Sequence, residues 1–349
     1  MPSTELRGFA QTVLGTINPS ELGPTTTHEH LYIDFSFMYR PPQDALTDLA
    51  DAPIAMENLG WIRHNHYSNH ANLQLMDVDT AISEAALYKN VGGGTIVDVT
   101  TIGIGRNATA LERISREAGV HVVMGAGFYV DAVLPDDMHQ RTVDIVAQRI
   151  IDDIRNGVDG TGIRAGIIGE IGCSWPLTDN ERLSLRASAL AQQETGAAIS
   201  IHPGRHPDAP AEILQALADG GADIERVVIG HLDRTIFDME RLRAVAASGC
   251  YLEWDLFGSE GSYYPLADLD MPSDAQRLGY IKRMCDEGYA TKIVVGQDIC
   301  TNHRLARYGG HGYGHILENI VPRMRRKGFA EDDIDAITVR NPADVLTFV

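Results

Sequence analysis

Eight short apolar runs, rich in β-branched residues, alternate along the chain with longer segments of helical periodicity. The runs cover residues 25–33, 93–101, 121–130, 164–172, 197–204, 226–234, 249–258 and 292–300. Expected helices lie between them, over 79–93, 107–119, 178–196, 208–221, 237–249 and 273–288. Near-continuous apolar strands that alternate with helices are typical of a parallel sheet covered on both faces. Eight such repeats predict a (β/α)₈ barrel, the TIM-barrel fold.

The principal alternative architecture is a doubly wound open sheet. A GxGxxG motif after the first strand would favour it, and the sequence has none there. No linker, low-complexity tract or block of like charges divides the 349 residues, so we expect one domain over 1–349. Residues 35–77, which include aromatic residues and prolines, would then form an elaborated loop after strand 1, on the face where barrels build their active sites.

The composition excludes several classes of partner. The formal net charge is −19 at pH 7, whereas nucleic acids and anionic membranes require a basic binding surface. The chain begins with no secretory signal pattern, and no stretch approaches the roughly 18 consecutive apolar residues of a membrane helix. The four cysteines are scattered and suggest reduced thiols. We therefore expect a cytoplasmic protein that acts on a small molecule.

Polar residues interrupt the apolar strands where several of these strands end. They are His28, Glu29 and His30 in THEH, Glu170 in GEIG, His202 in IHPG, His231 in GHLD and Asp298 in GQD. The strands of a barrel end at one common face, so we expect these side chains to converge. His28 and His30 are two residues apart and would point to the same side of their strand. Among these polar residues, the four imidazoles and the carboxylates of Glu170 and Asp298 are ligands that zinc and related metals accept, and they suffice for two ions.

These same motifs resemble the phosphotriesterase-like branch of the amidohydrolase superfamily. Longer stretches are similar to its phosphotriesterase-related group, part of which carries the label "resiniferatoxin-binding". They are GAGFYVDA (125–132), GIIGEIGCSWPLT (166–178), GHLDRT (230–235), DLFG (255–258) and YGGHGY (308–313). The resemblance covers nearly the whole chain.

The resemblance implies a set of ligands for a binuclear metal centre. They would be His28, His30 and Asp298 for the more buried ion, His202 and His231 for the more exposed ion, and Glu170 as the bridge between the two. Phosphotriesterases use a carboxylated lysine at the bridging position, so Glu170 is a departure that puts direct transfer of triesterase chemistry in doubt. Zinc is the expected metal, while manganese, cobalt or iron would suit the same donors.

The resemblance also implies a hydrolase. A hydroxide shared by the two ions would attack a carbonyl, and Asp298 would take its proton and pass it to the leaving group. The leading hypothesis is cleavage of the amide in an N-acyltaurine or N-acyl amino acid. One alternative is a lactone, phosphotriester or phosphoester hydrolase with the same metals. The other is a non-catalytic binding protein, which would not need a shared acid–base carboxylate. A homodimer is the assembly that the family favours.

Substrate contacts are expected from the loops that follow the strands. The candidates are Tyr129, Trp175, Arg205 and Arg234. Guanidinium groups suit carboxylate or sulfonate oxygens, and the alternative for each arginine is a structural ion pair with an aspartate. Asp233, two residues after His231, would either orient a ligand imidazole or cap the following helix.

Five further histidines lie in two loops. His64, His66 and His70 in HNHYSNH are expected to face solvent or pack within their loop. His311 and His315 in GGHGYGH belong to the last barrel loop, and the sequence leaves open whether they reach the site.

Overall fold

Eight parallel strands form one sheet in a computed structural model that describes residues 6–261 and 264–349. Their order in the sheet is β12-β11-β10-β9-β8-β7-β6-β3. The strands are β3 Thr25–Glu29, β6 Thr95–Asp98, β7 His121–Ala126, β8 Ile167–Gly172, β9 Ile199–His202, β10 Val227–Ile229, β11 Tyr251–Trp254 and β12 Ile293–Val295. Each lies within one of the eight predicted runs, and the predicted TIM barrel is confirmed.

The first and last strands, β3 and β12, meet at the seam that closes the barrel. The Asp298 amide donates to the His28 carbonyl at 3.0 Å, and the Thr27 hydroxyl donates to the Val295 carbonyl at 3.0 Å. A Cβ on Gly296 would lie 2.9 Å from both Cβ and the carbonyl oxygen of His28, so the close approach of the two strands requires glycine. The hydrogen bonds across the seam protect strand edges that would otherwise be unpaired.

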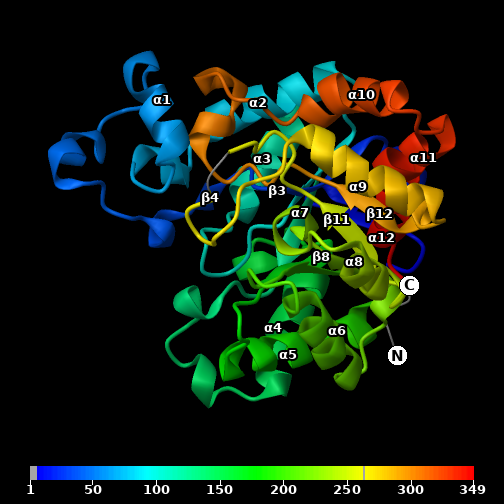
Figure 1. The fold of residues 1–349 in the computed structure, drawn as a ribbon. Coiled ribbons are helices and arrows are strands. Elements are labelled where there is room, and N and C mark those ends of the chain that lie inside the picture. Colours follow the sequence, from blue (N-terminus) through cyan, green and yellow to red (C-terminus); the bar gives the residue numbers. More distant parts are fainter. Residues whose placement is uncertain (1–5, 262–263) are drawn as a thin grey trace.

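Helices surround the barrel, as Figure 1 shows. They are α1 Met56–His64, α2 Val78–Asn90, α3 Ala108–Ala118, α4 Val143–Arg155, α5 Asp179–Thr195, α6 Ala209–Asp219, α7 Leu232–Thr235, α8 Met239–Ala246, α9 Asp274–Asp286, α10 Val321–Arg326, α11 Glu331–Asp335 and α12 Asn341–Leu346. The six predicted helices correspond to α2, α3, α5, α6, α8 and α9. Local signals define them: α5, for example, starts with a capping box between Thr178 and Glu181 and ends at Gly196 in the left-handed conformation.

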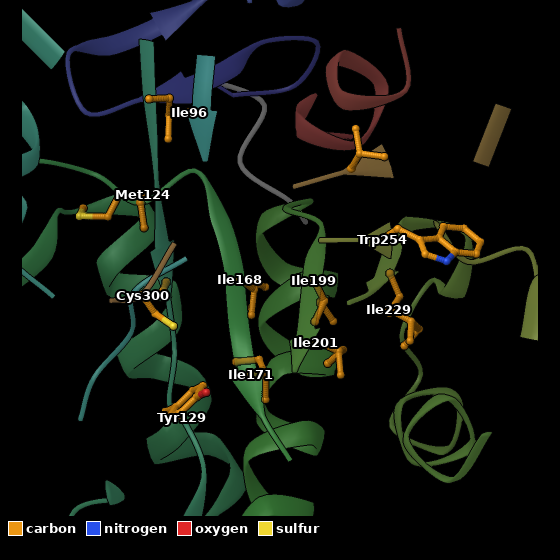
Figure 2. Close-up of a cluster of buried hydrophobic side chains, with 14 of the residues drawn as sticks. Ile96, Met124, Tyr129, Ile168, Ile171, Ile199, Ile201, Ile229, Trp254 and Cys300 are labelled. Carbon is orange, nitrogen blue, oxygen red and sulfur yellow. The ribbon is translucent and has the colours of Figure 1, made fainter. Parts of the chain in front are cut away.

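Alternate residues of the strands enter two different apolar layers. Inside the barrel one cluster contains Val97, Val99, Val123, Ile167, Ala198, Val228, Tyr251 and Val294. The residues between them, such as Ile96, Met124, Ile168, Ile199 and Ile229, belong to a larger cluster shared with the helices (Figure 2). This alternation is expected for strands that are buried on both faces.

The N-terminal end of the barrel is covered by the two ends of the described chain. A hairpin of β1 Ala10–Thr12 and β2 Gly15–Ile17 lies there, and Ala10 forms an antiparallel bridge with Thr347. Ala10, Val345 and Leu346 join the cluster inside the barrel. With this end closed, the C-terminal ends of the strands form the open face on which a barrel carries its site.

The segment predicted as an elaborated loop, 35–77, extends away from the barrel and contains α1 (Figure 1). Its last strand, β5 Gln74–Leu75, pairs antiparallel with β4 Ile33–Asp34. The segment is therefore tied back to the chain just after β3. No helix among the described residues is long and apolar enough to cross a membrane.

Candidate metal centre

The carboxylate of Glu170, at the end of β8, lies among four imidazoles. Its Oε2 atom is 2.9 Å from His202 Nδ1, 3.2 Å from His28 Nε2 and 3.6 Å from His231 Nε2. Its Oε1 atom is 3.3 Å from His30 Nε2. All five side chains are buried. The structure thus brings together five of the six residues predicted as metal ligands, with the four histidines around the carboxylate of Glu170.

Asp298, the sixth, approaches from the seam with its side chain 15% exposed, and its Oδ1 atom lies 3.2 Å from His30 Nε2. Its backbone φ is 48°, and that of His231 is 53°. Positive φ is unfavourable for residues other than glycine and is often found where a functional site requires it. In both cases the bend comes directly after a short strand, at the mouth of the barrel.

The donor set fits divalent cations. Nε2 of His28 is buried and has no hydrogen-bond partner among the described residues, although Glu170 Oε2 lies 3.2 Å away. Ligand atoms that lie within 4.8 Å of one another occur in three groups: His28, His30 and Glu170; His28, His231 and Asp255; and Glu170, His202 and His231. Two of these groups share Glu170, which matches a candidate binuclear site with one common carboxylate.

Charge interactions hold the carboxylates of this cluster ionised. Burial would raise the pKa of Asp298, but the hydrogen bond to His30 and the neighbouring imidazoles lower it. Burial alone would lower the pKa of His30, but its contacts with Asp298 and Glu170 raise that pKa to about 9. Ionised carboxylates are the form that binds a metal.

The histidine rings are oriented by residues that the sequence reasoning did not single out. Asp255 Oδ1 accepts a hydrogen bond from Nδ1 of His231 at 2.7 Å. Glu253 Oε2 lies 3.3 Å from Nδ1 of His28. Outer partners of this kind fix the tautomer and direction of metal-binding imidazoles. The signal was present, since two acidic residues at alternate positions interrupt the apolar run YLEWDLFG.

In the described chain, Asp233 neither contacts a ligand imidazole nor caps a helix, the two roles that the sequence suggested for it. Its Oδ2 atom accepts hydrogen bonds from Arg277 Nε at 2.7 Å and from the Leu256 amide at 3.0 Å. Helix α7 begins after His231 without a side-chain cap. Asp233 therefore holds the loop after β11, and Asp255 is the carboxylate that contacts the His231 ring.

A cavity of about 480 Å³ opens over the cluster. Its wall includes Tyr129, Arg205 and Arg234 from the predicted substrate contacts. Trp175, the fourth, is not among the described residues of that wall: it is 37% exposed and stacks on His206 with ring centroids 4.3 Å apart. Tyr129 reaches the centre itself, since its hydroxyl is 3.1 Å from Nδ1 of His202.

Three of the five loop histidines reach the cavity. His64, His66 and His311 line it, together with His303. His64 is exposed, as expected, although it also lines the cavity. His66 instead packs near His303 of another loop, with ring centroids 5.8 Å apart, so it is not confined to its own loop. His70 instead stacks on Tyr39 with ring centroids 3.8 Å apart, and His315 contacts Asp274 at 2.8 Å.

Arg205 and Arg234, the predicted substrate contacts among the arginines of the wall, have no carboxylate partner among the described residues. This disfavours the structural ion pairs that the sequence left open. Arg234 is 3% exposed, donates to the Pro203 carbonyl at 3.1 Å and lies 3.2 Å from Nε2 of His202. Arg205 donates to the Tyr264 hydroxyl at 2.8 Å. Burial, and then the charge of Arg205, lower the pKa of Arg234. Two neighbouring guanidinium groups that find no counter-ion in the described part of the chain suit an anionic ligand.

Fold and site together define a TIM barrel with a candidate binuclear metal centre at the C-terminal ends of its strands. Residues 8–346 match the Phosphotriesterase family. The chain is 48% identical over 347 residues to a phosphotriesterase-related protein of Nematostella vectensis, covering 98% of this chain and 99% of the relative. It is also 48% identical to the N-acetyltaurine hydrolase of Mus musculus, covering 99% of both.

Solved structures agree with these matches. A resiniferatoxin-binding protein from Rhodobacter sphaeroides superposes with a TM-score of 0.94 at 37% identity, covering 98% of this chain and 96% of that chain. The protein therefore belongs to the phosphotriesterase family and is a hydrolase of that family.

Proposed function

We propose that the protein hydrolyses the amide bond of N-acyl aminosulfonates or N-acyl amino acids, with N-acetyltaurine as the reference substrate. The observation that carries the proposal is the pair Arg205 and Arg234, which line the cavity beside the candidate metal centre and have no carboxylate partner within residues 6–261 and 264–349. An amide carbonyl at the centre would leave the anionic end of such a substrate within the same cavity. Relatives named N-acetyltaurine hydrolase, at 46–48% identity, support this choice.

The proposed metal ligands would have distinct roles in the reaction. We assign His28, His30 and Asp298 to one ion, His202 and His231 to the other, and Glu170 to both. Two divalent ions, zinc by the preference of imidazole donors, would supply polarisation of the carbonyl and a lowered pKa for water. Asp298 is the proposed carboxylate ligand that lines the cavity, so we assign it to hold a proton and deliver it to the leaving nitrogen. An amide needs this step because an amine anion is a poor leaving group.

Tyr129 and the two arginines would bind the substrate. The Tyr129 hydroxyl, beside His202, is placed to donate a hydrogen bond to an oxygen bound at the centre. Arg205 and Arg234 would hold the sulfonate or carboxylate and thereby fix the amide relative to Asp298. A lactone or a phosphotriester has no anionic group for these arginines and is a poorer fit to the cavity. An anionic phosphoester does have such a group, so the screen must decide between it and the amide.

The test is a hydrolysis screen of the metal-analysed protein. N-acetyltaurine is paired with N-ethylacetamide, which has the same amide and no sulfonate, and with N-acetyl amino acids, a lactone and a phosphotriester. We expect turnover of N-acetyltaurine or an N-acetyl amino acid at about two metals per chain, little turnover of N-ethylacetamide, and loss of activity in Asp298→Asn. Turnover confined to lactones or phosphoesters would replace the proposal by the alternative hydrolase. Bound metal without any turnover would favour a binding protein.

We propose a single domain over 1–349, a homodimer and a cytoplasmic location. One cooperative unfolding transition, a dimer mass by light scattering and fractionation of the source cells would check them in turn.

A further inference from the structure

Glu29 stands between two candidate ligands, His28 and His30, yet its carboxylate does not join the cluster around Glu170. The side chain is 0% exposed and reaches across the seam to the loop after β12. Its Oε1 atom accepts hydrogen bonds from the amide and the side-chain Nε2 of Gln297, both at 2.9 Å. Its Oε2 atom accepts from the amide of Ile299 at 3.1 Å.

The two amides held by Glu29 flank Asp298. The Asp298 amide itself donates to the carbonyl of His28 at 3.0 Å. Three successive backbone N–H groups, 297 to 299, are therefore fixed by β3, two of them through one carboxylate. Asp298 is also a residue with positive φ, 48°, a conformation that persists only where the surroundings enforce it.

We propose that Glu29 is a positioning residue that holds the backbone of Asp298 in this bend and so directs its carboxylate toward His30. A carboxylate suits the task because each of its oxygens accepts an amide of a different residue. Glutamine offers one acceptor oxygen and would turn an NH₂ group toward the other donor. The inference rests on the proposed metal centre. Glu29 would affect metal binding only because it positions Asp298, which we assign as a metal ligand.

The chain provides a matched control in Glu84. This side chain is also buried, and its two oxygens accept the amides of Ala306 and Arg307 at 2.9 and 2.8 Å. Glu84→Gln removes the same kind of clamp from a later part of the same loop. Among the described residues, its hydrogen-bond partners do not include residues 297–299, so its effect reports the general cost of losing a buried carboxylate clamp.

The experiment is a titration of the metal-free protein with Co²⁺, followed by visible absorption. The variants are Glu29→Gln, Glu84→Gln, Asp298→Asn and the double variant Glu29→Gln/Asp298→Asn, and thermal unfolding of each metal-free protein records its stability. We expect Glu29→Gln to weaken Co²⁺ binding about 10–100-fold. We expect Glu84→Gln to lose comparable stability and to keep the wild-type affinity. In the Asp298→Asn background, Glu29→Gln should add little, because its effect passes through Asp298.

Two results would overturn the inference while leaving the metal centre in place: equal Co²⁺ affinity in the two glutamine variants, or an undiminished effect of Glu29→Gln in the Asp298→Asn background. A wild-type protein that binds no Co²⁺ would overturn the metal centre and the inference together. If Glu29→Gln does not fold, Thr26→Val takes its place, since the Thr26 hydroxyl donates to Glu29 Oε1 at 2.5 Å. Weaker Co²⁺ binding in Thr26→Val would support the inference, and an unchanged affinity would contradict it.

Discussion

Asp255 connects the rings of His28 and His231. Its Oδ1 atom accepts from Nδ1 of His231 at 2.7 Å, and its Oδ2 atom lies 3.2 Å from Nδ1 of His28. The proposal assigns these two histidines to different ions, so one carboxylate orients a ligand of each. The two halves of the candidate centre are therefore coupled through Asp255 as well as through Glu170.

Replacing Asp255 by asparagine should weaken metal binding. An amide cannot accept from both rings as a carboxylate does, and loss of such an outer partner typically costs about 10–100-fold in affinity. Equilibrium dialysis against Zn²⁺ would measure the change. Asp233→Asn is the control: it alters a nearby buried aspartate that pairs with Arg277, and it should lower stability without a comparable loss of affinity. Equal losses in both variants would contradict the role given to Asp255.

Removal of the Arg205 charge should weaken substrate binding and leave the chemical step nearly unchanged. Charge-assisted hydrogen bonds contribute about 1.5–3 kcal/mol, so Arg205→Gln should lower kcat/KM for N-acetyltaurine about 10–100-fold, mainly through KM. Steady-state kinetics would measure this, and inhibition by the product taurine should weaken in parallel. An unchanged KM would place the anionic end of the substrate elsewhere in the cavity.

Acid should destabilise the fold through His66. Burial, and then the charge of Arg304, lower the pKa of His66 to about 4, while an unfolded histidine titrates near 6.5. Between these values the unfolded chain binds a proton that the folded chain does not. The stability is therefore complete above about pH 7 and falls toward pH 4, by at most about 3 kcal/mol from this residue. Urea unfolding across this range should show a shallower pH dependence in His66→Gln than in the wild type or in His64→Gln, which alters the exposed neighbour.

Arg277 should be indispensable for stability. Its guanidinium is 0% exposed and pairs with Asp233 at 2.7 Å and with Asp274 at 2.9 Å. Arg277→Met would leave the buried Asp233 carboxylate without its cation and would leave Asp274 with its contact to His315, at a cost of about 3–5 kcal/mol. Arg243→Met breaks a solvent-exposed pair with Glu287 and should cost far less stability. Urea midpoints would compare them, and equal losses would contradict the assignment.

The barrel and the location of the donor cluster were predictable because both follow from short-range patterns. Apolar strands alternate with capped helices, and polar residues such as Glu170 and His202 stand out where an apolar strand ends. Helix α4 carried the same signal, with Val146, Ile150 and Ile154 buried at helical spacing, but it was not among the predicted helices. Helices α10 to α12 follow the eighth strand. The alternation of strands and helices ends there, so it did not predict these helices.

The partners of these residues were not predictable in the same way. Asp233 is close to His231 in sequence, yet its carboxylate contacts Arg277 on α9. His66 reaches the cavity because its loop folds against a distant one, where its ring lies 5.8 Å from that of His303. Contacts of this kind depend on how separate loops pack together. The local periodicity of the sequence therefore does not predict them.

The seam between β3 and β12 has a consequence for the order in which the molecule forms. The bond from the Asp298 amide to the His28 carbonyl joins two residues 270 positions apart in the chain (298 − 28), and contacts this distant in sequence are slow to form. A nascent chain that has not yet reached β12 carries its histidines without the strand that closes the barrel beside them. Barrel closure and completion of the donor cluster are thus one event, and it comes late in synthesis. A partly made chain should therefore gain helices and strands well before it can retain a metal ion.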